Sequence, residues 1–195
     1  MVRLIVTREE YFDAAMEILA TEGAGSLKIT VLCKRLKVTS GSFYGYFGSF
    51  DGFVTELLEF WEDAQTLRIE ELSNVPPDPA DRIHTMRLLA GTVPHEAEAA
   101  IRSWAHTHPL VAVAQKRVDE HRLAALTEII RPACATRAEA HRLAMMGMTL
   151  LVGIQQWRSP VQKKEFDALF DEYEATVMNR YASRSARPSA SSRAM

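Results

Sequence analysis

The sequence is poor in cysteine and has no long apolar run. Two cysteines among 195 residues are too few for a disulfide framework. No run approaches the roughly 18 to 20 apolar residues of a membrane-spanning helix, since AMMGMTLLVGI at residues 144–154 has only eleven. The N-terminal MVRLIVTREEYFDAA becomes charged before the apolar core of a signal peptide could form. We therefore expect a cytoplasmic protein with no membrane partner.

The sequence also lacks an excess of charge and any catalytic motif. Its 23 basic and 25 acidic residues give a net charge of −2, so nucleic-acid binding would need a local surface or a site doubled by dimerisation. There is no phosphate-binding loop, nucleophile elbow or paired acid motif. His106 and His108 have no acid or thiol neighbours at the spacing of metal ligands. We expect no enzyme activity, no metal and no cofactor.

What the sequence does contain is the apolar spacing and the start signals of helices. Nearly everything after residue 6 has the apolar spacing of helices, and no stretch alternates with the period of a strand. Helix starts are predicted at Thr7 with Glu10, Asp78-Pro79, Pro94, His108-Pro109, Thr136 with Glu139, and Ser159-Pro160. One long helix is expected at about 51–73, before the proline-rich LSNVPPDPAD. The predicted fold class is all-α.

The segment TSGSFYGYFGSF, residues 39–50, holds five of the chain's sixteen aromatic residues among glycine, serine and threonine. Thr39 can cap a short helix on which Phe43 and Phe47 face the core. The preceding SLKITVLCKRLKV predicts another short helix and a turn at Lys37-Val38. Two short helices joined by such a turn form a helix-turn-helix, whose second helix enters the DNA major groove.

Small residues on the second helix would let its backbone approach DNA, and tyrosine hydroxyls could donate to phosphates. The predicted DNA contacts are Lys28, Thr30, Lys37, Thr39, Ser40, Gly41, Ser42, Tyr44 and Tyr46. Taken alone, the residues also allow a glycine-rich aromatic turn that serves only packing. Residues 1–53 carry six basic and six acidic side chains, so charge does not decide between the two.

Residues 7–60 resemble the N-terminal module of TetR-family bacterial regulators, and the stretch YFDAAMEILATEGAGSLKITVLCKRLKVTSGSFYGYFGSFDGFV, residues 11–54, follows the family pattern in order and spacing. This resemblance implies a DNA-binding domain at 1–53 and a ligand-sensing and dimerisation domain at 54–182, with about nine helices in all. Residues 183–195, rich in small and basic residues, are predicted to be disordered. Two positions depart from the family pattern: Lys37 stands where glycine is usual in the turn, and Phe50 where a phosphate-binding lysine is common.

Apolar residues of the last two helices recur at three- and four-residue steps. They predict a four-helix dimer interface around a two-fold axis, or a seam inside the protomer; both can hold, because one helix has several faces. The residues chosen for the interface are Leu143, Leu150, Ile154, Trp157, Phe166, Phe170, Tyr173 and Val177. Methionine and tryptophan line adaptable apolar pockets, so Trp61, Met86, Trp104, Met145 and Met148 are the predicted ligand contacts, with plain core packing as the alternative.

The expected function is a transcriptional repressor that binds a palindromic double-stranded DNA operator as a homodimer. A small, mostly apolar effector would release it. The alternatives are a redox- or metal-responsive regulator of the same fold, or a helical small-molecule-binding protein with a weakened DNA module. Buried packing is the expected role of Cys33.

Overall fold

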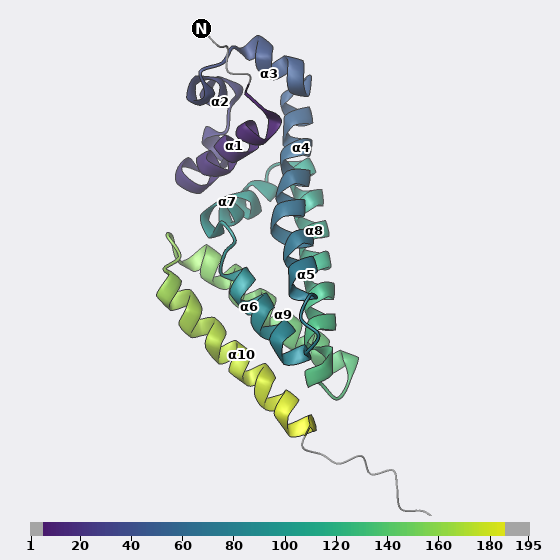
Figure 1. The fold of residues 1–195 in the computed structure, drawn as a ribbon. Helices are drawn as coiled ribbons and strands as arrows, with labels where there is room; N and C mark the ends of the chain where they lie inside the picture. The colour runs from purple at the N-terminus through teal and green to yellow at the C-terminus, as the bar shows by residue number, and fades with distance from the viewer. Residues whose placement is uncertain (1–5, 186–195) are drawn as a thin grey trace, which may run out of the picture.

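The computed structural model describes residues 6–185, and the regular structure within them is entirely helical, which confirms the all-α prediction (Figure 1). The helices are α1 (Arg8–Glu22), α2 (Ile29–Leu36), α3 (Ser40–Phe47), α4 (Phe50–Glu62), α5 (Arg68–Ser73), α6 (Pro79–Ala90), α7 (His95–Ala105), α8 (Pro109–Ile130), α9 (Arg137–Trp157) and α10 (Lys163–Ser185). Short 3-10 turns, η1 (Ala24–Ser26) and η3 (Arg131–Ala133), follow α1 and α8. None of the described helices is both long and apolar enough to cross a bilayer.

The predicted long helix at 51–73 is continuous but not uniform. A π-helical turn, η2 (Asp63–Leu67), joins α4 to α5, and the backbone stays helical from residue 50 to residue 73. In a π-turn each carbonyl pairs five residues ahead, which leaves some carbonyls open to other donors. Counting this joined helix once, the described residues contain nine α-helical rods, the number expected from the sequence.

Most helix starts lie where the sequence predicts them. The hydroxyl of Thr7 accepts from the Glu10 N–H, and the Glu10 carboxylate accepts in return from the Thr7 N–H at 2.7 Å. The predicted start at Ser159-Pro160 is wrong. The chain stays non-helical until Lys163, where α10 begins, and before that point the Val161 N–H donates to the Glu96 carboxylate of α7 at 2.7 Å.

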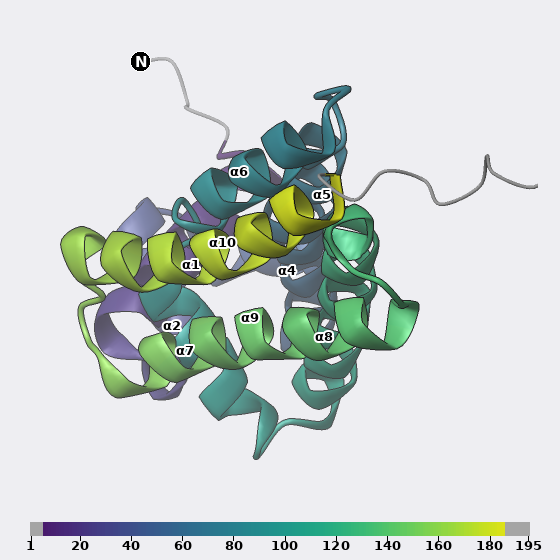
Figure 2. The same ribbon diagram turned by 90° about the horizontal axis from the view of Figure 1, so that it is seen from below.

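The helices form a compact head and a longer bundle. In Figure 1, α1 to α3 lie at one end, and the α4–η2–α5 rod runs from them alongside α8. In the view from below, α9 and α10 lie on the outside of the bundle (Figure 2). The rod therefore belongs to both parts of the molecule.

Two hydrophobic cores correspond to the head and the bundle, but the boundary between them does not lie at residue 53, where the sequence predicted the end of the first domain. The first core joins α1–α4 to α7 and the first half of α8. The second joins α6, the end of α8, α9 and α10. Phe53 and Val54, on either side of the predicted domain boundary, are both fully buried in the first core. The predicted tail starts too early, since residues 183–185 continue α10, and its remainder lies outside the described residues.

Candidate nucleic-acid interface and bundle cavity

Helices α2 and α3 form the predicted helix-turn-helix. Between them Lys37 adopts the left-handed conformation, with φ 56° and ψ 39°, and the Val38 N–H donates to the Cys33 carbonyl at 2.9 Å. Thr39 caps α3, since its hydroxyl accepts from the Ser42 N–H at 3.2 Å. The turn thus uses the backbone geometry that glycine usually supplies, with a lysine in its place.

Aromatic side chains on the inner face of α3 pack it against α1 and α4. Phe43 and Phe47 are buried, and their rings contact Tyr11 of α1 and Phe53 of α4 at centroid distances of 5.0 to 5.9 Å. Such tilted and edge-to-face pairs stabilise a core beyond the area they bury. One face of α3 is therefore anchored, and the other is free for a partner.

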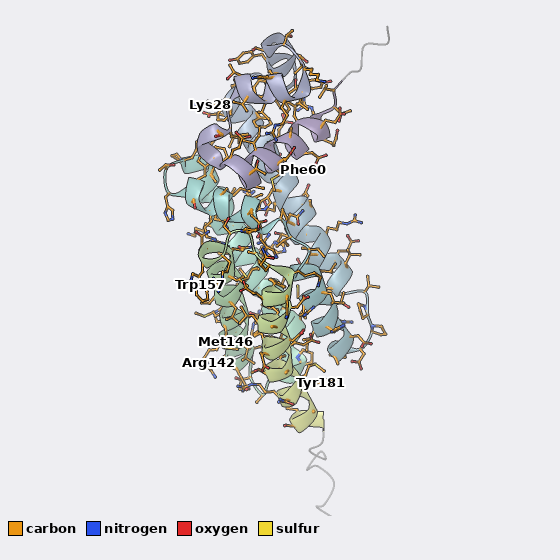
Figure 3. All side chains as sticks on the ribbon, turned by 90° about the vertical axis from the view of Figure 1, so that its left-hand side faces the viewer. Lys28, Phe60, Arg142, Met146, Trp157 and Tyr181 are labelled. Atoms are coloured by element: carbon orange, nitrogen blue, oxygen red, sulfur yellow. The ribbon has the colours of Figure 1, made fainter. Side chains whose placement is uncertain are left out.

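Most of the predicted DNA contacts lie on the outside of this motif. The exposed ones are Lys28, Thr30, Lys37, Thr39, Ser40, Gly41 and Tyr44, while Ser42 is half-buried. Figure 3 shows Lys28 on the outer side of the head. Small and hydroxyl-bearing residues therefore face outward at the start of α3.

Tyr46 is placed differently from Tyr44. Its hydroxyl donates to the Val6 carbonyl at 2.7 Å, so the predicted bond to a phosphate would require this one to break. The Tyr46 carbonyl in turn accepts from the Arg8 guanidinium at 2.8 Å, and Arg8 also pairs with Glu56 of α4. Tyr46 therefore ties the end of α3 to the start of α1. Nothing in the sequence pattern marked this joint, because its partners are 38 to 48 residues apart.

The balanced charge of the head is unevenly distributed. Arg35 pairs with Glu17 at 3.1 Å and with Glu22 at 2.7 Å, which occupies one cation and two carboxylates on the side of α1. Within residues 6–185, no carboxylate pairs with Lys28 or Lys37. These two ammonium groups remain available to an anionic partner.

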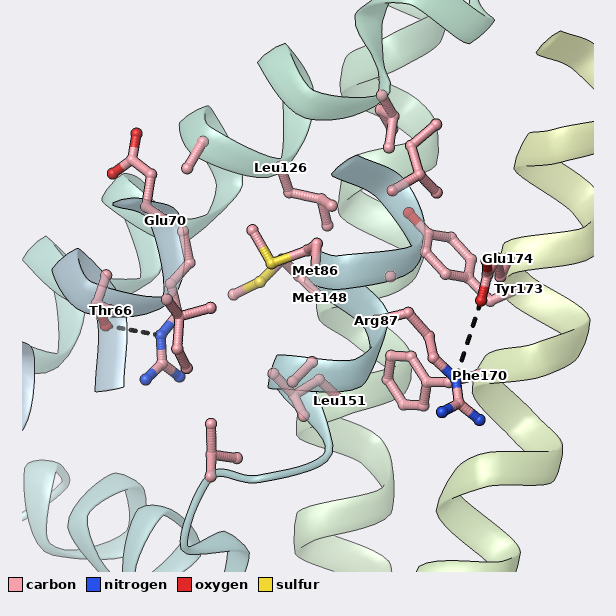
Figure 4. A pocket seen from close by; sticks show the side chains of 18 of the residues that line it. Thr66, Glu70, Met86, Arg87, Leu126, Met148, Leu151, Phe170, Tyr173 and Glu174 are labelled. Atoms are coloured by element: carbon pink, nitrogen blue, oxygen red, sulfur yellow. Dashed lines mark hydrogen bonds and ion pairs between the residues drawn. The ribbon is translucent and has the colours of Figure 1, made fainter. Parts of the chain in front are cut away.

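A cavity lies in the bundle between η2, α5, α6, α8, α9 and α10 (Figure 4). Its empty volume is about 820 Å³, including the part that opens to solvent. The apolar part of its wall consists of Ile69, Ile83, Met86, Ala90, Val93, Ala125, Leu126, Ile130, Met148, Leu151 and Phe170. A mainly apolar wall with a few polar groups is typical of sites for small organic ligands.

The five predicted ligand contacts lie in different parts of the structure. Met86 and Met148 line the cavity, but Trp61, Trp104 and Met145 do not. Trp61 is 1 % exposed and its indole N–H donates to Glu98 at 3.2 Å, whereas Trp104 packs beside His108. Met145 is exposed on α9. The apolar residue type alone could not show whether a side chain lines the cavity, packs in the core or lies on the surface.

A buried ion pair lies behind one end of the cavity. Arg122 lines the cavity and donates to both oxygens of Glu98, at 2.6 and 3.0 Å. It also donates to the Thr66 hydroxyl at 2.9 Å and to the Gln65 carbonyl of the π-turn at 3.1 Å. Although burial opposes the charge, Arg122 and hydrogen bonds from Gln155 and Trp61 lower the pKa of Glu98. Glu98 is thus held ionised.

Six of the eight predicted dimer residues belong to the protomer's own core. Leu143, Ile154, Phe166, Phe170, Tyr173 and Val177 are buried within the second core. Tyr173 also donates its hydroxyl to the Leu143 carbonyl at 2.9 Å and, with Phe170, lines the cavity. The apolar periodicity of these six residues therefore reflects packing within the protomer, which the sequence had left open beside a dimer interface.

The exposed apolar surface of α9 lies on its other side. Trp157 is 78 % exposed, and Met146 and the half-buried Leu150 precede it on the same helix. Figure 3 shows Trp157, Met146 and Arg142 along one edge of the molecule. A shallow groove beside them has Gly153 in its wall and continues to Leu169 of α10.

Both cysteines are buried. Burial raises the pKa of the Cys33 thiol and of the Cys134 thiol, which disfavours the reactive thiolate. Among the described residues, no three histidine, cysteine or acidic side chains lie close enough together to hold a metal ion.

Comparison with known proteins identifies the head. Residues 12–57 match the family model described as bacterial regulatory proteins of the tetR family. No curated protein matches the chain by sequence.

Solved structures of low sequence identity share the whole fold. A transcriptional regulator from Rhodococcus sp. Rha1 is 16 % identical with a TM-score of 0.73, covering 89 % of this chain and 97 % of its own. A TetR transcriptional regulator from Legionella pneumophila is 12 % identical with a TM-score of 0.72, covering 91 % and 98 %. The reduced form of NemR from E. coli is 19 % identical with a TM-score of 0.67, covering 89 % and 96 %. The helix-turn-helix head therefore matches the tetR family model over residues 12–57, and the chain as a whole shares its fold with these transcriptional regulators.

Proposed function

We propose that this regulator is a repressor that binds palindromic operator DNA as a homodimer and is released by a small, mostly apolar effector. The observation that carries the proposal is the α4–η2–α5 rod. It starts directly after α3, and Gln65, Thr66, Ile69 and Glu70 at its far end form part of the cavity wall. One helix therefore connects the outward face of α3 with the apolar cavity.

On the DNA side, α3 enters the major groove with its N-terminal residues toward the bases. Ser40, Gly41 and Ser42 allow close approach, while Tyr44, Lys28 and Lys37 reach phosphates from the flanks. One head supplies few phosphate contacts, so two heads are needed for firm binding. The operator is accordingly an inverted repeat.

The dimer forms through the exposed edge of α9 and α10. Trp157, Met146, Leu150 and the groove around Gly153 offer an apolar surface outside the protomer's core. Aromatic and methionine side chains are enriched in such interfaces. This placement replaces the buried residues that the sequence first suggested.

The effector acts through the rod. Two recognition helices must be about 34 Å apart to fit successive turns of one DNA face, so a small tilt of α4 changes the fit. An effector that binds the DNA-free form more tightly by a few kcal/mol suffices, and DNA must then weaken effector binding equally. The raised pKa values of both thiols favour this ligand response over the redox-responsive alternative.

The test combines operator selection with footprinting. DNA is selected in vitro by the full chain, and the protected region is mapped at several salt concentrations. We expect a two-fold symmetric footprint and a steep loss of affinity as salt rises. A footprint without two-fold symmetry, or binding by a monomer, would contradict the dimer. An absence of any selected sequence would contradict operator binding itself.

A further inference from the structure

The cavity wall carries charge of both signs. Its charged residues are two arginines, Arg122 and Arg87, and two glutamates, Glu70 and Glu174. Each is placed among apolar residues, where an uncompensated charge is costly. The pairing of these four groups therefore decides which charge a bound molecule can carry.

Both arginines are already neutralised by the protein. Arg122 is held by both carboxylate oxygens of Glu98, which is 3 % exposed. Arg87 pairs with Asp171, with Asp167 at 3.3 Å, and more distantly with Glu174 at 4.0 Å. A bound carboxylate would have to compete with these fixed partners. Among the residues that the structure describes, neither wall arginine is therefore left without a carboxylate, although the Arg87 Nε–H has no hydrogen-bond acceptor.

The two wall glutamates have histidine partners. Glu70 contacts His121, and Glu174 lies 2.9 Å from His84. Together with Glu98 and Asp167, four carboxylates lie around two guanidinium groups and two histidines, even without the largely exposed Asp171. The described wall residues therefore present an anion with no unopposed positive charge.

We infer that the effector is an uncharged molecule, with an apolar body and a hydroxyl or carbonyl group, and that Glu98 sets this preference by neutralising Arg122 from behind the wall. The inference rests on the proposed effector role of this cavity. A cation gains little here, because it would lose its hydration to meet carboxylates that already have partners. A neutral polar group can use the Thr66 and Arg122 end of the cavity without disturbing the balance.

Three probes with one apolar chain test the preference. Decan-1-ol, decanoate and decylammonium are titrated into the full chain by calorimetry, below the concentrations at which they aggregate. At about pH 7.5 the acid is ionised and the amine protonated. We expect decan-1-ol to bind most tightly and decanoate on the order of tenfold more weakly. Tighter binding of either charged probe overturns the inference. If none of the three binds, the effector role of the cavity fails, and the inference with it.

Matched variants test the role of Glu98. Glu98→Gln leaves Arg122 without a counter-charge, so the ratio of the decanoate Kd to the decan-1-ol Kd should fall by about tenfold. Glu70→Gln should lower the same ratio by a smaller factor, and it remains informative if Glu98→Gln does not fold, because Glu70 is partly exposed. The control is Glu71→Gln, an exposed neighbour outside the wall, which should leave the ratio unchanged. An unchanged ratio in both test variants overturns the assignment.

Discussion

At the scale of single residues, Lys37 combines a backbone conformation that glycine usually supplies with a charged side chain that glycine lacks. Its backbone occupies the left-handed region, which costs a non-glycine residue about 1 kcal/mol. Its exposed ammonium group has no carboxylate partner among the described residues and lies just before α3. The strained position is therefore occupied by a side chain that can reach a phosphate.

Replacing this lysine should separate stability from DNA binding. In Lys37→Gly the relief of left-handed strain is offset by the greater freedom of glycine in the unfolded chain, so the free energy of unfolding should change by less than about 0.5 kcal/mol. DNA affinity should fall, and the slope of log affinity against log salt should decrease by about one. Denaturant unfolding and fluorescence-anisotropy titrations measure the two quantities. An unchanged salt slope would show that Lys37 contacts no phosphate.

The two tyrosines of α3 offer a second residue-scale comparison. Tyr44 is 51 % exposed, so Tyr44→Phe should weaken binding to all DNA sequences equally, by about 1 kcal/mol, with no loss of stability. Tyr46→Phe removes the bond to Val6 and should destabilise the fold by about 1 kcal/mol. Thermal unfolding and binding to matched operator and random DNA distinguish the two. A change of sequence preference in Tyr44→Phe would contradict a phosphate role.

At the scale of helices, the junction between α3 and α4 depends on a close backbone approach. A Cβ atom on Gly52 would lie 2.3 Å from the Phe47 carbonyl oxygen, a distance that no real contact allows. The first turn of α4 is therefore pressed against the last turn of α3. Because the carbonyl is backbone, no side chain can move aside.

Alanine substitutions at two glycines test this junction. Gly52→Ala should destabilise the fold by about 1 to 3 kcal/mol and weaken DNA binding, because α3 and α4 must separate. Gly45→Ala is the matched control in α3: a Cβ atom added there would have nothing within 4 Å, so helix propensity should stabilise this variant by up to about 1 kcal/mol. Denaturant unfolding gives both values. Equal stability of the two variants would argue against the close approach.

At the scale of the whole molecule, the proposed dimer predicts where a charge should break assembly. Gly153 lies in the open groove beside Trp157, with nothing within 4 Å of an added Cβ, so Gly153→Arg should leave the protomer folded. At a dimer interface the buried guanidinium would be unpaired, which costs several kcal/mol. We expect monomers in analytical ultracentrifugation and much weaker operator binding. Val113→Arg, at an exposed apolar site on α8, is the control and should stay dimeric.

Local interactions made much of this fold predictable from sequence. Helix caps such as Thr7, Thr39 and Asp78 act within three residues, and the Phe43–Phe47 pair lies on one face of one helical turn. The turn at Lys37 was predicted for the same reason. Since each signal depends only on neighbours along the chain, the all-α class and the two short helices with their turn follow from the sequence by itself, whereas their reading as a DNA-binding motif rested on the family resemblance.

Tertiary structure decided what each apolar face packs against. The spacing of Phe170 and Tyr173 required only that one side of α10 be buried, and packing of α10 against α6, η3 and α9 placed that side in the protomer's core and cavity wall rather than at an interface. The Arg122–Glu98 pair joins residues 24 positions apart, and the Arg8–Glu56 pair residues 48 apart. The hydrophobic effect is not directional. The apolar periodicity therefore determines that one face of a helix is buried, whereas only the packed chain determines which residues cover that face.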